Sequence, residues 1–254
     1  MLNSRQLGTQ EFLTQFAPLH AVVAVAIAAA ARETPVLIVG APGTGKSTLA
    51  RAMHGRSPRA THPFVRIDTA VLTSARIERE LFGCPRAGRT PAVRAALSAR
   101  GTLYMSDVGA LTPRTQARLA RALRRGMFRM AGSSVDRVVR ARVIAGAPAH
   151  SAGSASRLAA PLAKVLAGSV ITLPALSERT VDIPLLAASF VASAASPGAR
   201  RIDPAAMLVL QQRAWPGNVA ELRAVVERAR CVAQDGHIRI EDLASAYGAH
   251  TLEA

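Results

Sequence analysis

Short apolar runs alternate with longer stretches of helical periodicity over the first two thirds of the chain. The runs are four or five residues long, contain β-branched side chains and are bounded by Gly, Pro or polar residues, as buried strands are. They predict strands at 35–39, 63–67, 101–105, 142–145 and 170–173. Helices are predicted at 11–33, 47–54 and 113–126. Strands that alternate with helices indicate an α/β domain with a mainly parallel sheet flanked by helices.

The pattern changes after Pro174, where the strand-like runs stop. Beyond it, residues 180–246 are predicted to form helices, interrupted by turn residues at 196–198, 215–217 and 235–236. A small, polar segment at 150–156 predicts a loop. We therefore expect an α/β domain over 15–178 and a small all-α domain over 179–246, with tails at 1–14 and 247–254.

The charge balance is strongly basic. The 254 residues are half apolar, which excludes a mainly disordered chain, and 32 basic against 16 acidic residues give a net charge of +16. Thirty of the basic residues are arginines; the two lysines are Lys46 and Lys164. This excess suits an acidic partner such as nucleic acid, an acidic protein surface or a nucleotide, or else a solvated Arg-rich surface. Composition does not distinguish an acidic partner from a solvated surface.

Cysteine content and hydropathy exclude two further classes of protein. Two cysteines, Cys84 and Cys231, cannot build a disulfide framework or a four-ligand zinc site. The longest apolar run, 21–31, has eleven residues, whereas a membrane-spanning helix needs about 20. We expect a reduced, cytoplasmic protein without a membrane partner.

One segment, 40–47, matches the phosphate-binding signature G-x-x-x-x-G-K-[ST] in full. It lies after a predicted strand and before a predicted helix, the context that this signature requires. Glycines let backbone N–H groups turn toward phosphate oxygens, and the helix N-terminus adds positive charge. Lys46 is expected to reach the β and γ phosphates, and the Ser47 hydroxyl to ligate Mg²⁺. The predicted ligand is a nucleotide with Mg²⁺, and the predicted nucleotide-binding residues of this segment are Gly40, Ala41, Pro42, Gly43, Thr44, Gly45, Lys46, Ser47 and Thr48.

From this loop onward the chain resembles the AAA+ domain of bacterial sigma-54-dependent transcriptional activators. Segments that match the family lie at 80–83 (ELFG), 101–104 (GTLY), 116–123 (QARLARAL), 173–179 (LPALSER) and 215–219 (WPGNV). The resemblance runs from about residue 15 to 246 and implies a P-loop AAA+ core with a small all-α lid. In that family, a ring of subunits hydrolyses ATP to remodel sigma-54 RNA polymerase. The resemblance thus implies that the cofactors are ATP or ADP with Mg²⁺.

The acidic residues that carry out hydrolysis in the family are altered here. The family's hydrolysis strand ends in LDE, and the corresponding segment ends in Met105-Ser106-Asp107. Ser106 therefore stands where the family has the aspartate that orients Mg²⁺, and serine substitutes poorly for a charged metal partner. Asp107 stands where the family's glutamate polarises water. It is the candidate catalytic residue, unless it is only a solvated acid at a strand end.

The positions that sense or stabilise the γ-phosphate in the family also differ. The segment 145–148 (AGAP) lacks the polar side chain of the family's AATN. The two arginine-finger positions are Ala159 and Val165, with Arg157 and Lys164 nearby. Arg157 and Lys164 are either substitutes for the missing fingers or ordinary surface charges.

Two departures concern the lid and the partner-binding loop. The family's lid arginine corresponds to Ala220, while Arg223 lies three residues on along the same helix face and is a further candidate nucleotide contact. The family's sigma-54-contacting GAFTGA loop corresponds to 87–92, with Arg89 at the Phe position and Pro91 at a Gly position. The basic region from Arg86 to Arg100 would bind phosphate or an acidic protein, or be solvated. No aromatic residue lies within it to stack on single-stranded bases.

Three functions remain open. The favoured one is an ATP-binding regulator with degraded hydrolysis and sigma-54-contact motifs, acting in transcription regulation by assembling with homologous AAA+ subunits in a homo- or hetero-oligomer, and with the transcription machinery. The second is a working AAA+ ATPase in which Asp107 and Arg223 compensate. The third is a basic module that binds nucleic acid or protein and needs nucleotide for folding. Because no helix-turn-helix follows the lid, direct sequence-specific DNA binding is not expected.

Overall fold

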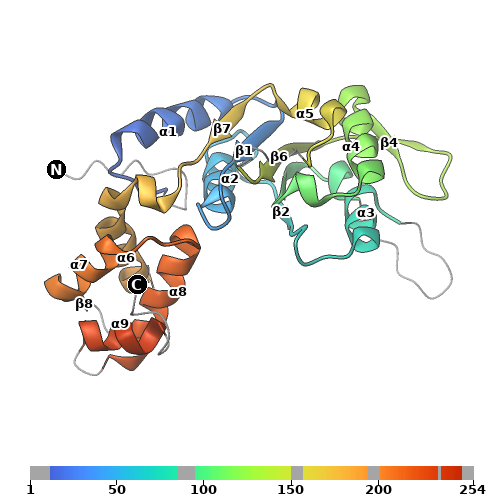
Figure 1. Ribbon diagram of the computed structural model, residues 1–254. Coiled ribbons are helices and arrows are strands. Elements are labelled where there is room, and N and C mark those ends of the chain that lie inside the picture. The colour runs from blue at the N-terminus through green and yellow to red at the C-terminus, as the bar shows by residue number, and fades with distance from the viewer. Residues whose placement is uncertain (1–11, 85–94, 150–156, 194–200, 234–235, 248–254) are drawn as a thin grey trace.

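A computed structural model describes residues 12–84, 95–149, 157–193, 201–233 and 236–247 of the chain. Figure 1 shows an α/β unit, which contains the N-terminal two thirds of the chain, and a separate helical unit formed by the C-terminal third. The predicted loop at 150–156 and the segment 87–92 lie outside the described residues.

The α/β unit is built on a five-stranded sheet in the order β2-β3-β6-β1-β7, and every pair of neighbours in it is parallel. This confirms the five predicted strands and the parallel sheet. Because Val39 pairs with Ala147 and Ile67 with Met105, the carboxyl ends of the central strands meet at one edge. The strand bounds are β1 Val36–Val39, β2 Phe64–Ile67, β3 Gly101–Met105, β6 Ala141–Ala147 and β7 Val170–Thr172.

Helices cover both faces of this sheet, and each face has its own apolar core. On one face, α1 and α2 bury residues such as Leu19 and Leu49 against Ile38. On the other, α3, α4 and α5 bury residues such as Leu119 and Leu162. These helices span α1 Ala17–Ala30, α2 Lys46–Gly55, α3 Ser74–Phe82, α4 Pro113–Arg125 and α5 Ala160–Leu166.

The α/β unit departs from the predicted pattern in four places. Helix α1 is shorter than the predicted 11–33; it begins at Ala17, with Pro18 in its first turn, where a missing N–H has no cost. The short helices α3 and α5 were not predicted. Neither was the antiparallel hairpin of β4 Met127–Arg129 and β5 Asp136–Val138. Single 3-10 turns at Ala96–Ser98, Val108–Ala110, Leu176–Glu178 and Thr180–Asp182 complete the connections.

The C-terminal unit is helical, as expected. Its helices are α6 Ile183–Ser193, α7 Pro204–Gln212, α8 Asn218–Val232 and α9 Ile240–Tyr247. They pack around Trp215, which is 1% exposed and donates its indole N–H to the carbonyl of Leu210 at 2.7 Å. Two-residue strands, β8 Arg201–Ile202 and β9 His237–Ile238, add a short parallel pairing that the sequence pattern did not indicate.

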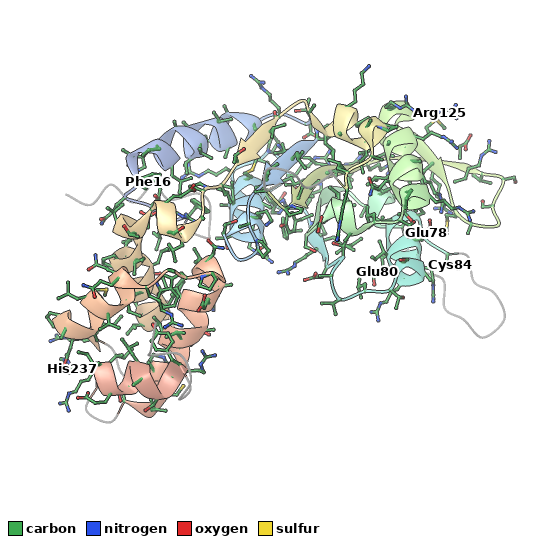
Figure 2. All side chains as sticks on the ribbon, viewed as in Figure 1. Phe16, Glu78, Glu80, Cys84, Arg125 and His237 are labelled. Atoms are coloured by element: carbon green, nitrogen blue, oxygen red, sulfur yellow. The ribbon has the colours of Figure 1, made fainter. Side chains whose placement is uncertain are left out.

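A buried polar cluster joins the two units near the start of α1, where Phe16 lies beside the helical unit (Figure 2). Asp182 is fully buried and accepts hydrogen bonds from the Thr14 hydroxyl and the backbone N–H of Phe16. Arg179 lies 3.9 Å from Asp182 and donates to the carbonyl of Thr44 at 2.8 Å. The junction between the units is thereby bonded both to the N-terminal segment and to the phosphate loop.

Among the described residues, no helix is both long enough and apolar enough to cross a membrane.

Candidate nucleotide site

The loop between β1 and α2 adopts the curved backbone that its sequence predicted. Gly43 and Gly45 have φ angles of +78° and +100°, a region that glycine enters without steric cost. A Cβ at position 43 would stand 2.1 Å from the carbonyl oxygen of Gly217 in the lid, so only glycine allows this approach. Helix α2 begins at Lys46, directly after the second of these glycines. Its free N-terminal N–H groups and positive dipole end suit an anion here.

The Lys46 ammonium folds back over the loop. Its Nζ donates to the carbonyl oxygens of Gly40 at 2.6 Å and Ala41 at 2.9 Å. Burial lowers the pKa of Lys46, while the nearby negative charge of Asp107 acts in the opposite direction. A phosphate group would give this partly desolvated ammonium a charged partner in place of carbonyl groups.

A cavity of about 460 Å³ lies beside the loop, between the strand ends and the lid. It brings together eight of the predicted site residues, and three others lie behind its wall. Of those three, Gly40 and Ala41 offer carbonyls to Lys46, and buried Thr44 donates its hydroxyl to the Ala41 carbonyl at 2.9 Å. The eight that line it are Pro42, Gly43, Gly45, Lys46, Ser47, Thr48, Asp107 and Arg223.

Ser106 and Asp107 directly follow β3 and line the same cavity as the loop. The Asp107 carboxylate accepts the backbone N–H of Gly109 at 2.8 Å and so caps the following 3-10 turn. Ser106 Oγ donates to Asp68 at 3.1 Å and accepts the Thr69 N–H at 3.0 Å. The serine hydroxyl is thus held within a network that ends on a carboxylate.

That carboxylate, Asp68, is a residue that the sequence reasoning missed. It follows β2, lines the cavity, and forms an ion pair with Arg66 at 2.6 Å. Burial alone would raise the pKa of Asp68, but hydrogen bonds from Arg66 and Ser106 outweigh burial and lower it. The sequence did contain a signal for Asp68, namely an acidic residue directly after a predicted strand. That signal points to the site only once β2 is known to pair with β3, because this pairing brings Asp68 next to Ser106.

The lid supplies the remaining wall of the cavity through Phe190, Val219, Ala220 and Arg223. Ala220 donates its N–H to the Gly43 carbonyl at 3.2 Å, which seats the start of α8 against the phosphate loop. The Arg223 side chain is 61% exposed and is bonded to Glu227 at 2.7 Å. Arg223 therefore stands at the rim of the cavity, where a nucleotide would compete with Glu227 for its guanidinium.

At the remaining described positions where the chain departs from the family, no charged side chain lines the nucleotide cavity. Pro148, within the segment 145–148, contributes only an apolar ring to the cavity wall. Ala159 caps α5 and Val165 lies in its last turn, and neither has a polar side chain. The exposed Arg157 and Lys164 do not line this cavity. Neither basic residue therefore reaches the nucleotide cavity of its own chain.

Oxygen ligands suited to Mg²⁺ face this cavity. Ser47, Asp68 and Asp107 come from three different elements and offer a hydroxyl and two carboxylates, the hard donors that Mg²⁺ prefers. The described residues contain no cluster of three or more His, Cys, Asp or Glu side chains that could hold a metal alone. The donor set fits an ion that shares its coordination with nucleotide phosphates and water.

Comparison with known proteins supports this architecture. Residues 12–157 match the sigma-54 interaction domain, and residues 177–254 match the AAA+ ATPase lid domain. The chain is 36% identical to a Nif-specific regulatory protein of Azospirillum brasilense, with 83% of this chain and 35% of that protein covered. It is also 36% identical to the hydrogenase transcriptional regulatory protein HoxA of Cupriavidus necator, with 88% and 48% covered. The chain thus spans about a third to a half of the length of these curated relatives.

Solved structures of NtrX from Brucella abortus have the same fold. The complex with ATP superposes with a TM-score of 0.76 at 29% identity, covering 91% of this chain and 55% of NtrX. The complex with ADP gives 0.79 at 29% identity, with 97% and 58% covered. The match to the family model over 12–157, the 36% identity to these relatives and the shared fold show that the chain belongs to the sigma-54 interaction domain family of AAA+ proteins.

Proposed function

We propose that this chain binds ATP or ADP with Mg²⁺ at the 40–47 loop and acts in transcription regulation by assembling with homologous AAA+ subunits. Its own ATP hydrolysis is slow or absent. The observation that carries this proposal is one cavity that combines a complete phosphate loop with Ser106 at the position of the family's metal-orienting acid and Ala220 at that of its lid arginine. NtrX, which shares the fold, is described in complex with ATP and with ADP.

The binding half of the proposal rests on the loop. Lys46 and the N-terminal N–H groups of α2 offer charge and donors to phosphates, and Ser47 offers its hydroxyl to the metal. Mg²⁺, when bound, would neutralise charge on the β and γ phosphates. Ala220 and Arg223 cover the loop from the lid, so the bound nucleotide would contact both units of the chain.

The loss of hydrolysis follows from the electrostatics of phosphoryl transfer. Such transfer is catalysed almost entirely by positioned charge, and one arginine finger is worth about 10³–10⁵ in rate. Here both finger positions are apolar, and the metal-orienting acid is replaced by Ser106, whose hydroxyl is bonded to Asp68 and Thr69. Starting from about 1 s⁻¹, the missing fingers alone reduce turnover to about 10⁻³ s⁻¹ or below.

The same departures support assembly with a homologue. A partner subunit that retains its own charged residues would add what this cavity lacks, since Arg157 and Lys164 lie outside it. Direct contact with sigma-54 by this chain alone is not proposed, because Arg89 and Pro91 replace the apolar, flexible tip of the family's loop.

Asp68 favours a second candidate function, a working ATPase of altered chemistry. Its carboxylate lies 3.1 Å from Ser106 Oγ and on the same wall as Asp107. The negative charge missing at position 106 is thus present directly after the neighbouring strand, β2. In a working ATPase of this kind, Asp68 would orient the metal and its water ligands, and Asp107 would polarise the attacking water.

Steady-state phosphate release, measured beside nucleotide binding, separates the two functions. The proposal expects nucleotide binding with a Lys46-dependent turnover near or below ~10⁻³ s⁻¹. A turnover of about 0.1 s⁻¹ or more that disappears in Lys46→Ala would establish the ATPase instead. Failure to bind ATP and ADP would refute both.

A further inference from the structure

A line of arginines runs along helix α4 at the end of the α/β unit remote from the lid. Arg114, Arg118, Arg121 and Arg125 follow one another at spacings of four, three and four residues, which places them on one face of the helix. These four residues form what we call the arginine stripe. At 1.5 Å rise per residue, the stripe is about 16 Å long.

The packing of α4 forces the stripe outward. The opposite face of the helix buries Leu119, Ala120 and Ala122 against the core, whereas Arg114, Arg121 and Arg125 are exposed. The helix begins at a Thr112 cap whose side chain accepts the Thr115 N–H, and the following Pro113 sets the backbone of its first turn. The stripe is therefore a rigid row of charges on a well-anchored helix.

Contacts hold the middle of the stripe in place. The Arg118 guanidinium stacks 3.9 Å from the centre of the Phe82 ring and lies 3.5 Å from Glu78 on α3. It also donates to the carbonyl of Arg129 at 2.7 Å, which ties the β4–β5 hairpin to α4. The hairpin therefore extends the same basic surface.

Little negative charge balances this surface. Residues 113–140 contain eight arginines and one acidic residue, Asp136, which pairs with Arg129 at 2.5 Å. A hollow of about 500 Å³ between α4 and the hairpin is lined by Arg121, Arg125 and Arg129. Among the described residues, neither Arg114 nor Arg121 pairs with an acidic side chain. In Figure 2, Arg125 lies at the outer end of the α/β unit, away from the lid.

We propose that the arginine stripe binds the phosphate backbone of a nucleic-acid duplex without reading its sequence. Guanidinium groups match phosphate oxygens in geometry, and a row of four at regular helical spacing suits a line of phosphates. No exposed aromatic ring on this surface offers a platform for unpaired bases, since Phe128 is 6% exposed. The ligand class is therefore a duplex, and the site is independent of the nucleotide cavity.

The test measures binding of a fluorescent 30-base-pair DNA duplex to the full chain over a range of salt concentrations. Because Arg118 is already engaged by Glu78 and the Arg129 carbonyl, the three exposed arginines of the stripe set the salt dependence. Three phosphate contacts predict that log K falls with log[salt] at a slope of about −2.7. In the variant Arg121→Ala/Arg125→Ala, the slope should shrink by about 1.8 and affinity in 0.1 M salt should fall at least about tenfold. Both changes are on the exposed face of a helix, where alanine is well tolerated.

The matched control is Arg32→Ala/Arg201→Ala, which removes two exposed arginines outside the stripe. The proposal expects this control to change duplex affinity less than about threefold, with melting temperatures near wild type for both variants. Equal losses in the two variants would overturn it, because bulk charge would then explain binding. Stripe-dependent capture of poly-glutamate without capture of the duplex would also overturn it, in favour of an acidic protein partner.

Discussion

Asn218 bridges the phosphate loop and the lid: its Nδ2 donates to the carbonyl of Pro42 at 2.9 Å, while its Oδ1 accepts the N–H of Leu176 at 2.8 Å. The residue is 4% exposed and has a φ angle of +56°, a left-handed backbone that asparagine tolerates better than most residues. A single side chain therefore couples the position of the loop to the start of α8.

Replacing Asn218 should loosen this coupling. Asn218→Gly keeps the left-handed backbone but removes both hydrogen bonds, and we expect a loss of about 1–3 kcal/mol in stability together with weaker nucleotide binding. Asn218→Asp retains the acceptor for Leu176 but presents an oxygen to the Pro42 carbonyl. Both variants should weaken nucleotide binding, as measured by titration calorimetry. Wild-type affinity in both variants would show that the lid contact does not position the loop.

Loss of the Lys46 ammonium should abolish the stabilisation by nucleotide. Wild type in ATP or ADP with Mg²⁺ at 100 times Kd should gain about 2.7 kcal/mol and a higher Tm. Lys46→Ala should show no such gain at the same concentrations, as measured by thermal unfolding. The matched control is Lys164→Ala, which removes the chain's other lysine from an exposed site on α5 and should respond like wild type.

The pairing of Ser106 with Asp68 predicts an unusual response to restoring the family's acid. Ser106→Asp places a second carboxylate about 3 Å from Asp68 and removes a hydroxyl donor. It should cost about 1–3 kcal/mol in stability without raising phosphate release. Ser106→Asp/Asp68→Asn removes the repulsion, so its Tm should return toward the wild-type value. If Ser106→Asp alone were as stable as wild type, the two side chains could not be as close as the structure places them.

Acid should destabilise the α/β unit through His54. Burial lowers the pKa of His54 below its ordinary value of 6.5, and its Nδ1 lies 2.9 Å from the hydroxyl of buried Thr102. Because the folded state favours the neutral ring, the unfolded state binds the proton more readily. The contribution of His54 is complete above pH 6.5 and is lost as pH falls toward the folded-state pKa.

The measurement for His54 is Tm between pH 7.5 and 5.5, a window chosen around the imidazole pKa of about 6.5 and above that of carboxylates. His54→Gln should lower Tm at neutral pH but flatten its dependence on pH, since glutamine carries no titrating proton. His20→Gln serves as control: His20 is half-buried on α1 and is not among the groups that shift the pKa of His54, so this variant should leave the wild-type slope unchanged. Parallel curves for wild type and His54→Gln would place the acid sensitivity elsewhere.

Local sequence determined much of this protein. The run 35–39, with Val36, Ile38 and Val39 between a proline and a glycine, is typical of a buried strand, and the glycines of the 40–47 loop predicted its curvature. These features depend only on residues close together in the chain. The predicted helical character of the C-terminal unit has the same origin.

Tertiary structure decided the rest of the site. Asp68 meets Ser106 because β2 lies beside β3 in the sheet, an adjacency that links residues 38 positions apart. Asn218 meets Pro42 across 176 positions because the lid packs against the loop. The hairpin β4–β5 was missed because its three-residue strands are mostly exposed and are held through contacts with α4. Helix α3 did carry a local signal, a Thr73 cap followed by Ile77 and Leu81 at a spacing of four, although no helix was predicted there. Propensity and periodicity report only on neighbours in sequence, whereas the chemistry of this cavity depends on which strand ends and which lid helix the packed core brings together.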